Sequence, residues 1–384
     1  MDDQIIEEIS NHYRHLHRFP ELSFHEHKTA SYVADVLRNY GLDVVQLPSN
    51  AVLALFKGQK QGKTIGLRAE LDALPIQELT GIDYASQNEG VMHACGHDLH
   101  MACALGTFKM LVSQAESVCG NVLFIFQHAE EKIPGGAKDV LESSFFQKNK
   151  PDVMLALHSF PDLKVGEFGV REGAYMASGD EIDILVHGPG GHAALPHKTV
   201  DTVLVASQIV VALQQVASRF IPSDIPSVLT FGNISANSVM NIIPKLVKLE
   251  GTFRIMVEEW RNKAIEQIKN IAVNLAKAAG ATCEVVVRRG YPAISNHSTY
   301  TRKVRQALIE TFGADSVKEL PIRMTTDDFG YYAQAIPSVY FRLGVADALG
   351  QCAGLHTSEF LPQLSAIRYG VEALTEIINY ILND

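Results

Sequence analysis

The stretch "TIGLRAELD", residues 64–72, decides the fold: it is an apolar run of strand length that ends in an acidic residue. Two further apolar runs, "NVLFIF" at 121–126 and "DVMLAL" at 152–157, lead in the same way to an acidic pair and to a histidine. Short runs that are apolar on both faces are typical of buried strands in a parallel sheet. Ligands of open α/β sheets lie beyond the carboxyl ends of such strands, so we expect these polar residues to converge.

Helical patterns separate several of these runs. "HMACALGTFKMLVSQA" at 100–115 follows the first of them, and two helices are expected within residues 1–40, the second closed by Gly41. Further buried strands are predicted at 51–56 and 338–343. Strands that alternate with helices predict an α/β domain with a mixed sheet covered by helices.

The pattern changes near residue 178. A strand with alternating polarity, a helix at 200–220, two strands, a charged helix at 258–280 and a last strand follow one another. The order β-α-β-β-α-β is that of the ferredoxin-like unit. We therefore predict an inserted α+β domain at 178–290 and a discontinuous main domain, residues 1–177 and 291–384.

Composition narrows the class of protein. The chain has 384 residues, 47% of them hydrophobic, and a net charge of -10. This acidic balance argues against nucleic acid or an anionic membrane surface as a partner. The longest apolar stretches look far short of a membrane span, and the acidic N-terminal segment has no apolar run of a secretory signal. Five scattered cysteines fit a reducing cytoplasm better than a disulfide framework.

The segment "VMHACGHDLHM" at 91–101 concentrates metal-binding side chains. Cys95 and His97 are two residues apart, so an extended or turn segment can direct both toward one ion. Thiolate, imidazole and carboxylate are all metal ligands. Of the adjacent acids Glu130 and Glu131, one could bind metal while the other takes a proton from a water activated by the metal. The histidines at 12, 15, 17, 25 and 27 are expected to be solvated, with His17 the one that could reach the rim of the site.

Nine short motifs in order resemble one family. They are "HRFPELSFHE", "LRAELDALPIQE", "MHACGHD", "AEEKIPGGAK", "ALHSFPDLKVGEFGVREG", "GGHAALPH", "NIIPKLVKLEGTFR", "DDFGYY" and "GLHTSEF". Together they cover essentially the whole chain and resemble the M20 metallopeptidases, in particular their amidohydrolase subfamily. That subfamily includes N-acyl-amino-acid amidohydrolases, hippurate hydrolases, N-acetyldiaminopimelate deacetylases and plant auxin-conjugate hydrolases.

The resemblance implies a metal-dependent hydrolase that cleaves the amide bond of N-acyl amino acids, acetylated or aromatic. It implies two divalent ions per subunit (zinc, manganese, cobalt or nickel) and the following roles. The metal ligands would be Cys95, His97, Glu131, His158 and His356, with His97 bridging; Glu130 would be the general base, Asp72 its supporting acid, His192 the group that polarises the carbonyl, and Asn241 and Arg254 the substrate anchors.

The resemblance also implies that the insert is a lid and the surface of a homodimer, with His192 donated in many members by the partner subunit. Three positions depart from the common pattern: Glu70 stands where aspartate is common, which should matter little, His128 replaces a proline, and Lys132-Ile133 adds residues beside the acids. N-acetyldiaminopimelate deacetylation or hydrolysis of small dipeptides stays open as a narrower alternative. Two alternatives belong to other classes: a catalytically silent metal- and ligand-binding protein, and a hydrolase that uses Cys95 as nucleophile.

Overall fold

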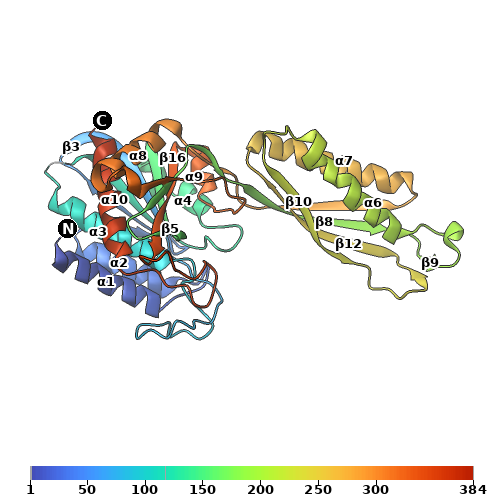
Figure 1. Ribbon diagram of the computed structural model, residues 1–384, viewed down its shortest axis with the longest axis horizontal. Coiled ribbons are helices and arrows are strands. Elements are labelled where there is room, and N and C mark those ends of the chain that lie inside the picture. The colour runs from blue at the N-terminus through green and yellow to red at the C-terminus, as the bar shows by residue number, and fades with distance from the viewer. Residues whose placement is uncertain (1, 117, 384) are drawn as a thin grey trace. The chain divides into compact units, whose positions relative to one another are not determined.

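The computed structural model describes residues 2–116 and 118–383. The chain forms two compact units (Figure 1). Unit 1 comprises Met1–Gly173, Ser295–Pro321 and Asp327–Asp384, and unit 2 comprises Ala174–Ile294 and Ile322–Thr326. The predicted insert at 178–290 lies inside unit 2, which begins and ends a few residues further out. The short segment 322–326 also joins unit 2, although the sequence pattern assigned it to the main domain.

Unit 1 is built on an eight-stranded sheet in the order β1-β2-β4-β3-β5-β16-β6-β15. The strands are β1 (Val44–Gln46), β2 (Val52–Lys57), β3 (Lys60–Glu70), β4 (Cys119–Gln127), β5 (Val153–Lys164), β6 (Phe168–Val170), β15 (Val317–Glu319) and β16 (Ser338–Ala346). The central strands β4, β3, β5 and β16 are parallel, whereas β1 and β2 on one side and β6 on the other add antiparallel pairs. The predicted mixed sheet is confirmed.

Helices cover this sheet. They are α1 (Asp3–Arg18), α2 (His27–Asn39), α3 (His97–Ser113), α4 (Ala137–Glu142), α5 (Ser144–Lys148), α8 (Ser298–Phe312), η3 (Ala314–Ser316), α9 (Gly330–Ala335) and α10 (Ala366–Leu382). α10 packs against α3 and α8, and α1 packs against α3. Every residue of β16 is buried, which explains why its sequence is apolar without alternation. α3 is buried on nearly all sides for the same reason.

Unit 2 has a four-stranded antiparallel sheet in the order β10-β12-β8-β13 with α6 and α7 packed against it. Its elements are β8 (Ser178–His187), β9 (Gly191–His192), η1 (Pro196–Lys198), α6 (Thr202–Gln215), η2 (Val216–Phe220), β10 (Ser227–Ser235), β11 (Ile242–Ile243), β12 (Leu246–Ile255), α7 (Glu258–Ala278) and β13 (Thr282–Arg289). The chain passes between the units in β7 (Gly173–Met176) and β14 (Ile294–Asn296). The predicted β-α-β-β-α-β order is present, with the short β9 and β11 added.

One helix corrects an expectation about membranes. α6 and η2 run continuously from Thr202 to Phe220, and this segment is long and apolar enough to cross a membrane by length and composition alone. The statement that apolar stretches fall far short of a span was therefore wrong for this segment. Val205, Ile209 and Leu213 are buried in the core of unit 2, as in the core helix of a folded domain.

Candidate metal centre

The carboxyl ends of β3 and β4 lie at one edge of the sheet of unit 1. Glu70, the last residue of β3, stands opposite Gln127, the last residue of β4. The residues that follow these ends, Asp72 on one strand and Glu130 and Glu131 on the other, therefore emerge together. This register is the reason that acids far apart in the sequence meet.

Cys95 and His97 reach the same edge from the turn that starts α3. Between them, Gly96 has φ +81°, a left-handed conformation that glycine adopts without strain. A Cβ at Gly96 would also lie 2.6 Å from the Ser159 hydroxyl. Glycine therefore permits the tight turn that turns the neighbouring thiol and imidazole toward the same space.

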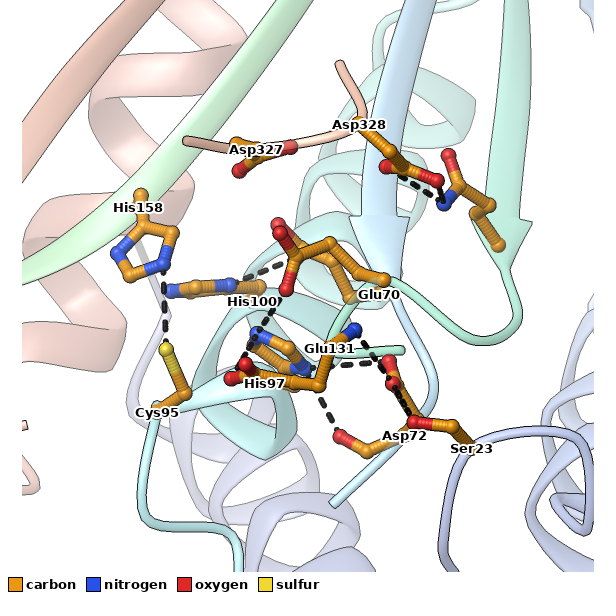
Figure 2. A network of polar contacts seen from close by, with 12 residues as sticks. Ser23, Glu70, Asp72, Cys95, His97, His100, Glu131, His158, Asp327 and Asp328 are labelled. Atoms are coloured by element: carbon orange, nitrogen blue, oxygen red, sulfur yellow. Dashed lines mark hydrogen bonds and ion pairs between the residues drawn. The ribbon is translucent and has the colours of Figure 1, made fainter. Parts of the chain in front are cut away.

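The five residues predicted as metal ligands are gathered at this edge. Cys95 Sγ lies 3.5 Å from His158 Nε2 (Figure 2), and Glu131 Oε1 lies 3.2 Å from His356 Nε2. His97 Nε2 lies 4.0 Å from the same Glu131 oxygen. Two overlapping groups, Cys95–His97–His158 and Cys95–Glu131–His356, each keep their donor atoms within 4.8 Å of one another.

His158 was predicted to follow the end of its strand, but it lies in the middle of β5. The apolar run was expected to end at this histidine, but β5 continues to Lys164, and His158 is paired in register with Arg342 of β16. The strand continues because residues 159–161 are also buried and pair onward, which no local pattern indicated. His158 faces the cluster from the middle of a strand.

Asp72 fixes the imidazole of His97. His97 Nδ1 lies 2.8 Å from the backbone carbonyl of Asp72 and 3.5 Å from its carboxylate. The Asp72 carboxylate also accepts hydrogen bonds from the Ser23 hydroxyl (2.7 Å) and the Glu131 backbone N–H (2.9 Å). Because Nδ1 is engaged, Nε2 is the ring nitrogen of His97 that faces the cluster.

A buried ion-pair network lies behind the donors. Arg68 is paired with Glu70, with Asp327 at 3.0 Å and with Asp328 at 2.7 Å. Glu70 also bonds His100 Nδ1 at 2.8 Å (Figure 2). Glu70, which stands where aspartate is common in the family, thus joins Arg68 to the helix that begins at His97.

Glu70, His100 and Asp327 belong to further groups with metal-ligand spacing, but their donor atoms are occupied. His100 Nδ1 bonds Glu70, and its Nε2 accepts from the backbone N–H of Ser159 at 2.8 Å. Asp327 bonds Arg68 and the Tyr340 hydroxyl. Because these atoms already bond neighbouring protein groups, we place Glu70, His100 and Asp327 around the cluster and not within it.

The donor set fits divalent cations. His97 Nε2 and Asp72 Oδ1 are buried and have no hydrogen-bond partner among the described residues, a costly state for polar atoms unless a cation or water accompanies them. Burial lowers the pKa of His97, but Glu70 and Asp72 outweigh it and raise that pKa to about 10. Acids that hold a proton on a buried imidazole this strongly also favour a divalent cation in its place.

The surroundings of Glu130 and Cys95 both favour the protonated form. Burial, then Asp327 and Glu131, raise the pKa of Glu130 well above its usual range, as expected of a carboxyl group that must accept and release a proton near neutral pH. Burial, then Glu131 and Glu130, also raise the pKa of the Cys95 thiol. Because a nucleophilic cysteine and a cysteine that binds metal both need the thiolate form, metal removal, and not this pKa, distinguishes the two roles of Cys95.

The other predicted residues lie in unit 2. His192 is exposed on β9 opposite Ile242 of β11, and its Nδ1 accepts from the backbone N–H of Ala194 at 3.1 Å. Asn241 is exposed next to this pair, and its carbonyl accepts from the Ala193 N–H at 3.0 Å. Arg254 on β12 donates to the Met324 carbonyl at 3.1 Å and has no carboxylate partner within residues 2–116 and 118–383.

Sequence reasoning gave no role to several polar residues that surround the cluster. Arg68 was read as part of an apolar strand, and Asp327 and Asp328 were part of a motif without an assigned task. A charged residue inside an otherwise buried strand was the available signal, because an arginine is buried in such a place when acids surround it.

Fold and donor set together define the class: a metal-dependent hydrolase. A family model described as peptidase family M20/M25/M40 matches residues 66–380, and the chain belongs to that family. The resemblance read from the nine motifs and the predicted metal-dependent amidohydrolase class are confirmed.

Named relatives agree with this class. The chain is 38% identical to the N-acetyldiaminopimelate deacetylase of Oceanobacillus iheyensis, over 95% of this chain and 97% of that protein. It is 35% identical to the N-acetyldiaminopimelate deacetylase of Limosilactobacillus fermentum, over 97% of each chain. Among solved structures, the Bacillus subtilis YXEP protein, described as a dinuclear metal binding peptidase from the M20 family, matches with a TM-score of 0.87 and 30% identity, over 100% of this chain and 99% of that one.

Proposed function

We propose that this protein hydrolyses the amide bond of N-acyl amino acids and releases a carboxylic acid and a free amino acid. N-acetyldiaminopimelate is the first substrate to test, since two relatives that cover nearly the whole chain bear the name of its deacetylase. The observation that carries the proposal is a second acid, Glu130, buried beside the five predicted ligands; it also has ligand spacing with His97 and Glu131, and we assign it to proton transfer because those five residues already supply two groups of donors. A protein that merely binds a ligand has no use for this carboxylate.

Cys95, His97, Glu131, His158 and His356 would hold two divalent ions. Because the Asp72 carbonyl engages Nδ1 of His97, His97 would offer the single lone pair of Nε2 to one of these ions, and the expectation that it bridges both does not fit this geometry. When bound, such ions supply positive charge that polarises a carbonyl and acidifies water. Zinc fits the sulfur and imidazole donors; manganese, cobalt and nickel are the alternatives to test.

The chain's own groups would move the protons. Glu130 takes a proton from the attacking water as the C–O bond forms, and returns it to the leaving nitrogen as the C–N bond breaks. Asp72 holds His97 and the Glu131 backbone in place throughout. Burial, then Asp327 and Glu131, raise the pKa of Glu130, which suits a group that must first accept the proton.

Unit 2 would supply the remaining contacts. Arg254 is half-buried and lacks an acidic partner in the described chain, and a planar guanidinium binds carboxylates through two parallel hydrogen bonds. It would anchor the carboxylate of the amino acid together with Asn241. His192 would polarise the scissile carbonyl. In this proposal the 178–290 insert acts as a lid that closes over the substrate and excludes water.

Unit 2 would also form a homodimer. Several of its large apolar side chains are exposed, and they gather in α6 and around β9 and β11: Leu195, Val203, Leu204, Val211, Val239, Met240 and Ile242. Exposed apolar groups in this number favour a covered surface, and a second copy of the chain would allow His192 to act across subunits. No disulfide joins the five cysteines within residues 2–116 and 118–383, which fits the proposed reducing, cytoplasmic location.

Glu130→Gln tests the proposal. We expect kcat for N-acetyldiaminopimelate to fall by about 10²–10⁴-fold because the proton acceptor is lost, while the metal content of the purified protein stays unchanged. Glu142→Gln, at an exposed position in α4, is the matched control and should keep wild-type kcat.

Two outcomes would contradict the proposal. A Glu130→Gln protein that turns over at the wild-type rate would remove the base. A wild-type protein that binds metal and N-acyl amino acids but hydrolyses none of a panel of N-acetyl and N-benzoyl amino acids would be the silent binding protein instead.

A further inference from the structure

Glu26 is a buried acid that the mechanism above does not use. It lies in the turn between α1 and α2 and is fully buried. Its Oε1 accepts two backbone hydrogen bonds, from Phe24 N–H at 3.0 Å and from Ala129 N–H at 2.8 Å. The second bond joins the N-terminal segment to the residue that immediately precedes Glu130.

Ala129 has an unusual backbone conformation. Its φ is +51°, in the left-handed region that a residue with a Cβ rarely occupies, because there the Cβ lies too close to the carbonyl oxygen. Such a conformation persists where contacts with the surrounding structure hold it in place. Phe24, the other residue whose N–H Glu26 accepts, also has positive φ, +69°. Both unfavourable conformations are thus bonded to the same carboxylate oxygen.

The turn at Ala129 sets the direction of the two acids that follow. β4 ends at Gln127, and the chain turns away from the strand before it reaches Glu130 and Glu131. The far end of this segment is held as well, because Asp328 accepts from the backbone N–H groups of Gly136 (2.9 Å) and Ala137 (3.0 Å). Buried carboxylates from distant parts of the chain therefore fix residues 129–137 at both ends.

Glu26 has no competing task in its own helix. It occupies the position before the first residue of α2, but its side chain makes no capping hydrogen bond there. The helix is capped instead by Glu21, whose Oε2 accepts from Thr29 N–H at 2.8 Å and Thr29 Oγ1 at 3.0 Å. Oε1 of Glu26 bonds the turns at Phe24 and Ala129, and Oε2 accepts a longer hydrogen bond, 3.5 Å, from Asn50 Nδ2.

We propose that Glu26 is a positioning residue for the reaction: by holding Ala129 in its left-handed turn, it aims Glu130 at the reacting atoms. This rests on the proposed function, in which Glu130 is the base. The feature of Glu26 that matters is an oxygen that accepts two N–H groups, and its negative charge is not required. An amide oxygen at the same place should therefore serve, and a methyl group should not.

The test compares Glu26→Ala, Glu26→Gln and the control Glu21→Ala. We expect Glu26→Ala to lower kcat by about 10–100-fold, since a misplacement of about 1 Å costs this much, with unchanged KM and unchanged bound metal per chain by elemental analysis. Glu26→Gln should stay within a few-fold of wild-type kcat. Glu21→Ala should lower the melting temperature through loss of a helix cap but leave kcat unchanged.

A rescue variant separates positioning from general damage. Adding Ala129→Gly to Glu26→Ala should recover part of the lost kcat, because glycine adopts positive φ without strain. If Glu26→Ala does not fold, the single variant Ala129→Val carries the test: its β-branched side chain disfavours the left-handed turn, so kcat should fall while Glu26 stays in place.

Three results would overturn the proposal: wild-type kcat in Glu26→Ala, equal loss in Glu26→Gln and Glu26→Ala, or wild-type kcat in Ala129→Val. These failures are distinct from failure of the proposed function, which shows as an active Glu130→Gln enzyme. Glu26 is refuted as a positioning residue where Glu130→Gln is inactive and Glu26→Ala is not.

Discussion

His17 lies between two buried carboxylates, and both of its ring nitrogens are engaged. Nδ1 is 2.6 Å from Asp98 and Nε2 is 3.1 Å from Glu78. The expectation of a solvated side chain was wrong for His17, because its neighbours in α1 gave no sign of the two acids that reach it from elsewhere. Asp98 lies next to His97. One of its carboxylate oxygens bonds His17, and the other accepts from the Leu99 N–H. His17 thereby ties α1 to the start of α3.

His17 should make stability depend on pH. Burial lowers its pKa, but Asp98 and Glu78 raise it above the ordinary value of 6.5, to about 9. Its contribution is fully present below pH 6.5 and is lost as pH rises through about 9, a loss of about 3 kcal/mol at 1.36 kcal/mol per pKa unit. Urea unfolding from below pH 6.5 to above pH 9 measures this loss.

The variant His17→Gln should be less stable and should lack this part of the pH dependence. His187→Gln, at an exposed position in β8, should retain it. An unchanged pH dependence in His17→Gln would show that other groups are responsible.

At the scale of elements, α6 has two faces with different partners. Val205, Ile209 and Leu213 are buried in unit 2, whereas Val203, Leu204 and Val211 are exposed, the last at 74%. A helix that is apolar on both faces buries both in its final assembly. The apolar residues on both faces of α6 therefore support the proposed homodimer. The same residues make the helix apolar enough to cross a membrane by composition.

Val211→Glu tests the dimer. A charge in the middle of this exposed face should produce a particle with the mass of one 42.1 kDa chain in sedimentation equilibrium, with little change in melting temperature because Val211 is not part of the core. Activity should fall strongly if His192 acts across subunits. Gln147→Glu, an added charge at an exposed position in unit 1, should change neither mass nor activity. If the Val211→Glu variant is still a dimer, a surface other than this face of α6 forms the interface.

At the scale of the whole molecule, unit 1 joins distant parts of the chain through a group of buried charges. Arg68 from β3 pairs with Asp327 and Asp328 from the C-terminal segment, and His356 reaches Glu131. Acids exceed cations at this edge, so the folded chain contains repulsion that divalent cations would relieve. Bound metal should therefore increase the stability of the folded chain in addition to its part in hydrolysis.

Metal removal tests this coupling. Dialysis against a chelator should abolish hydrolysis and lower the melting temperature, and zinc or manganese should restore both. The chelator should have no such effect on a hydrolase that uses Cys95 as nucleophile, so full activity in a metal-free sample would overturn the metal-dependent mechanism.

Local pattern determined which segments form strands and helices, and where acids follow strands. Buried strands such as β16 and the order of elements in unit 2 follow from periodicity, because a side chain's face is set by its neighbours in sequence. The metal donors Cys95 and His97 were equally visible, since two donor residues close in sequence can face one ion.

Tertiary structure decided which distant groups meet. The position of His158 inside β5, the partners of His17 and the hydrogen bond from Ala129 to Glu26 all depend on contacts between segments far apart in sequence. The role of Glu70 beside Arg68 and His100 depends on sheet register in the same way. Burial and pairing are properties of the packed chain, and no local pattern specifies which buried charge lies opposite which.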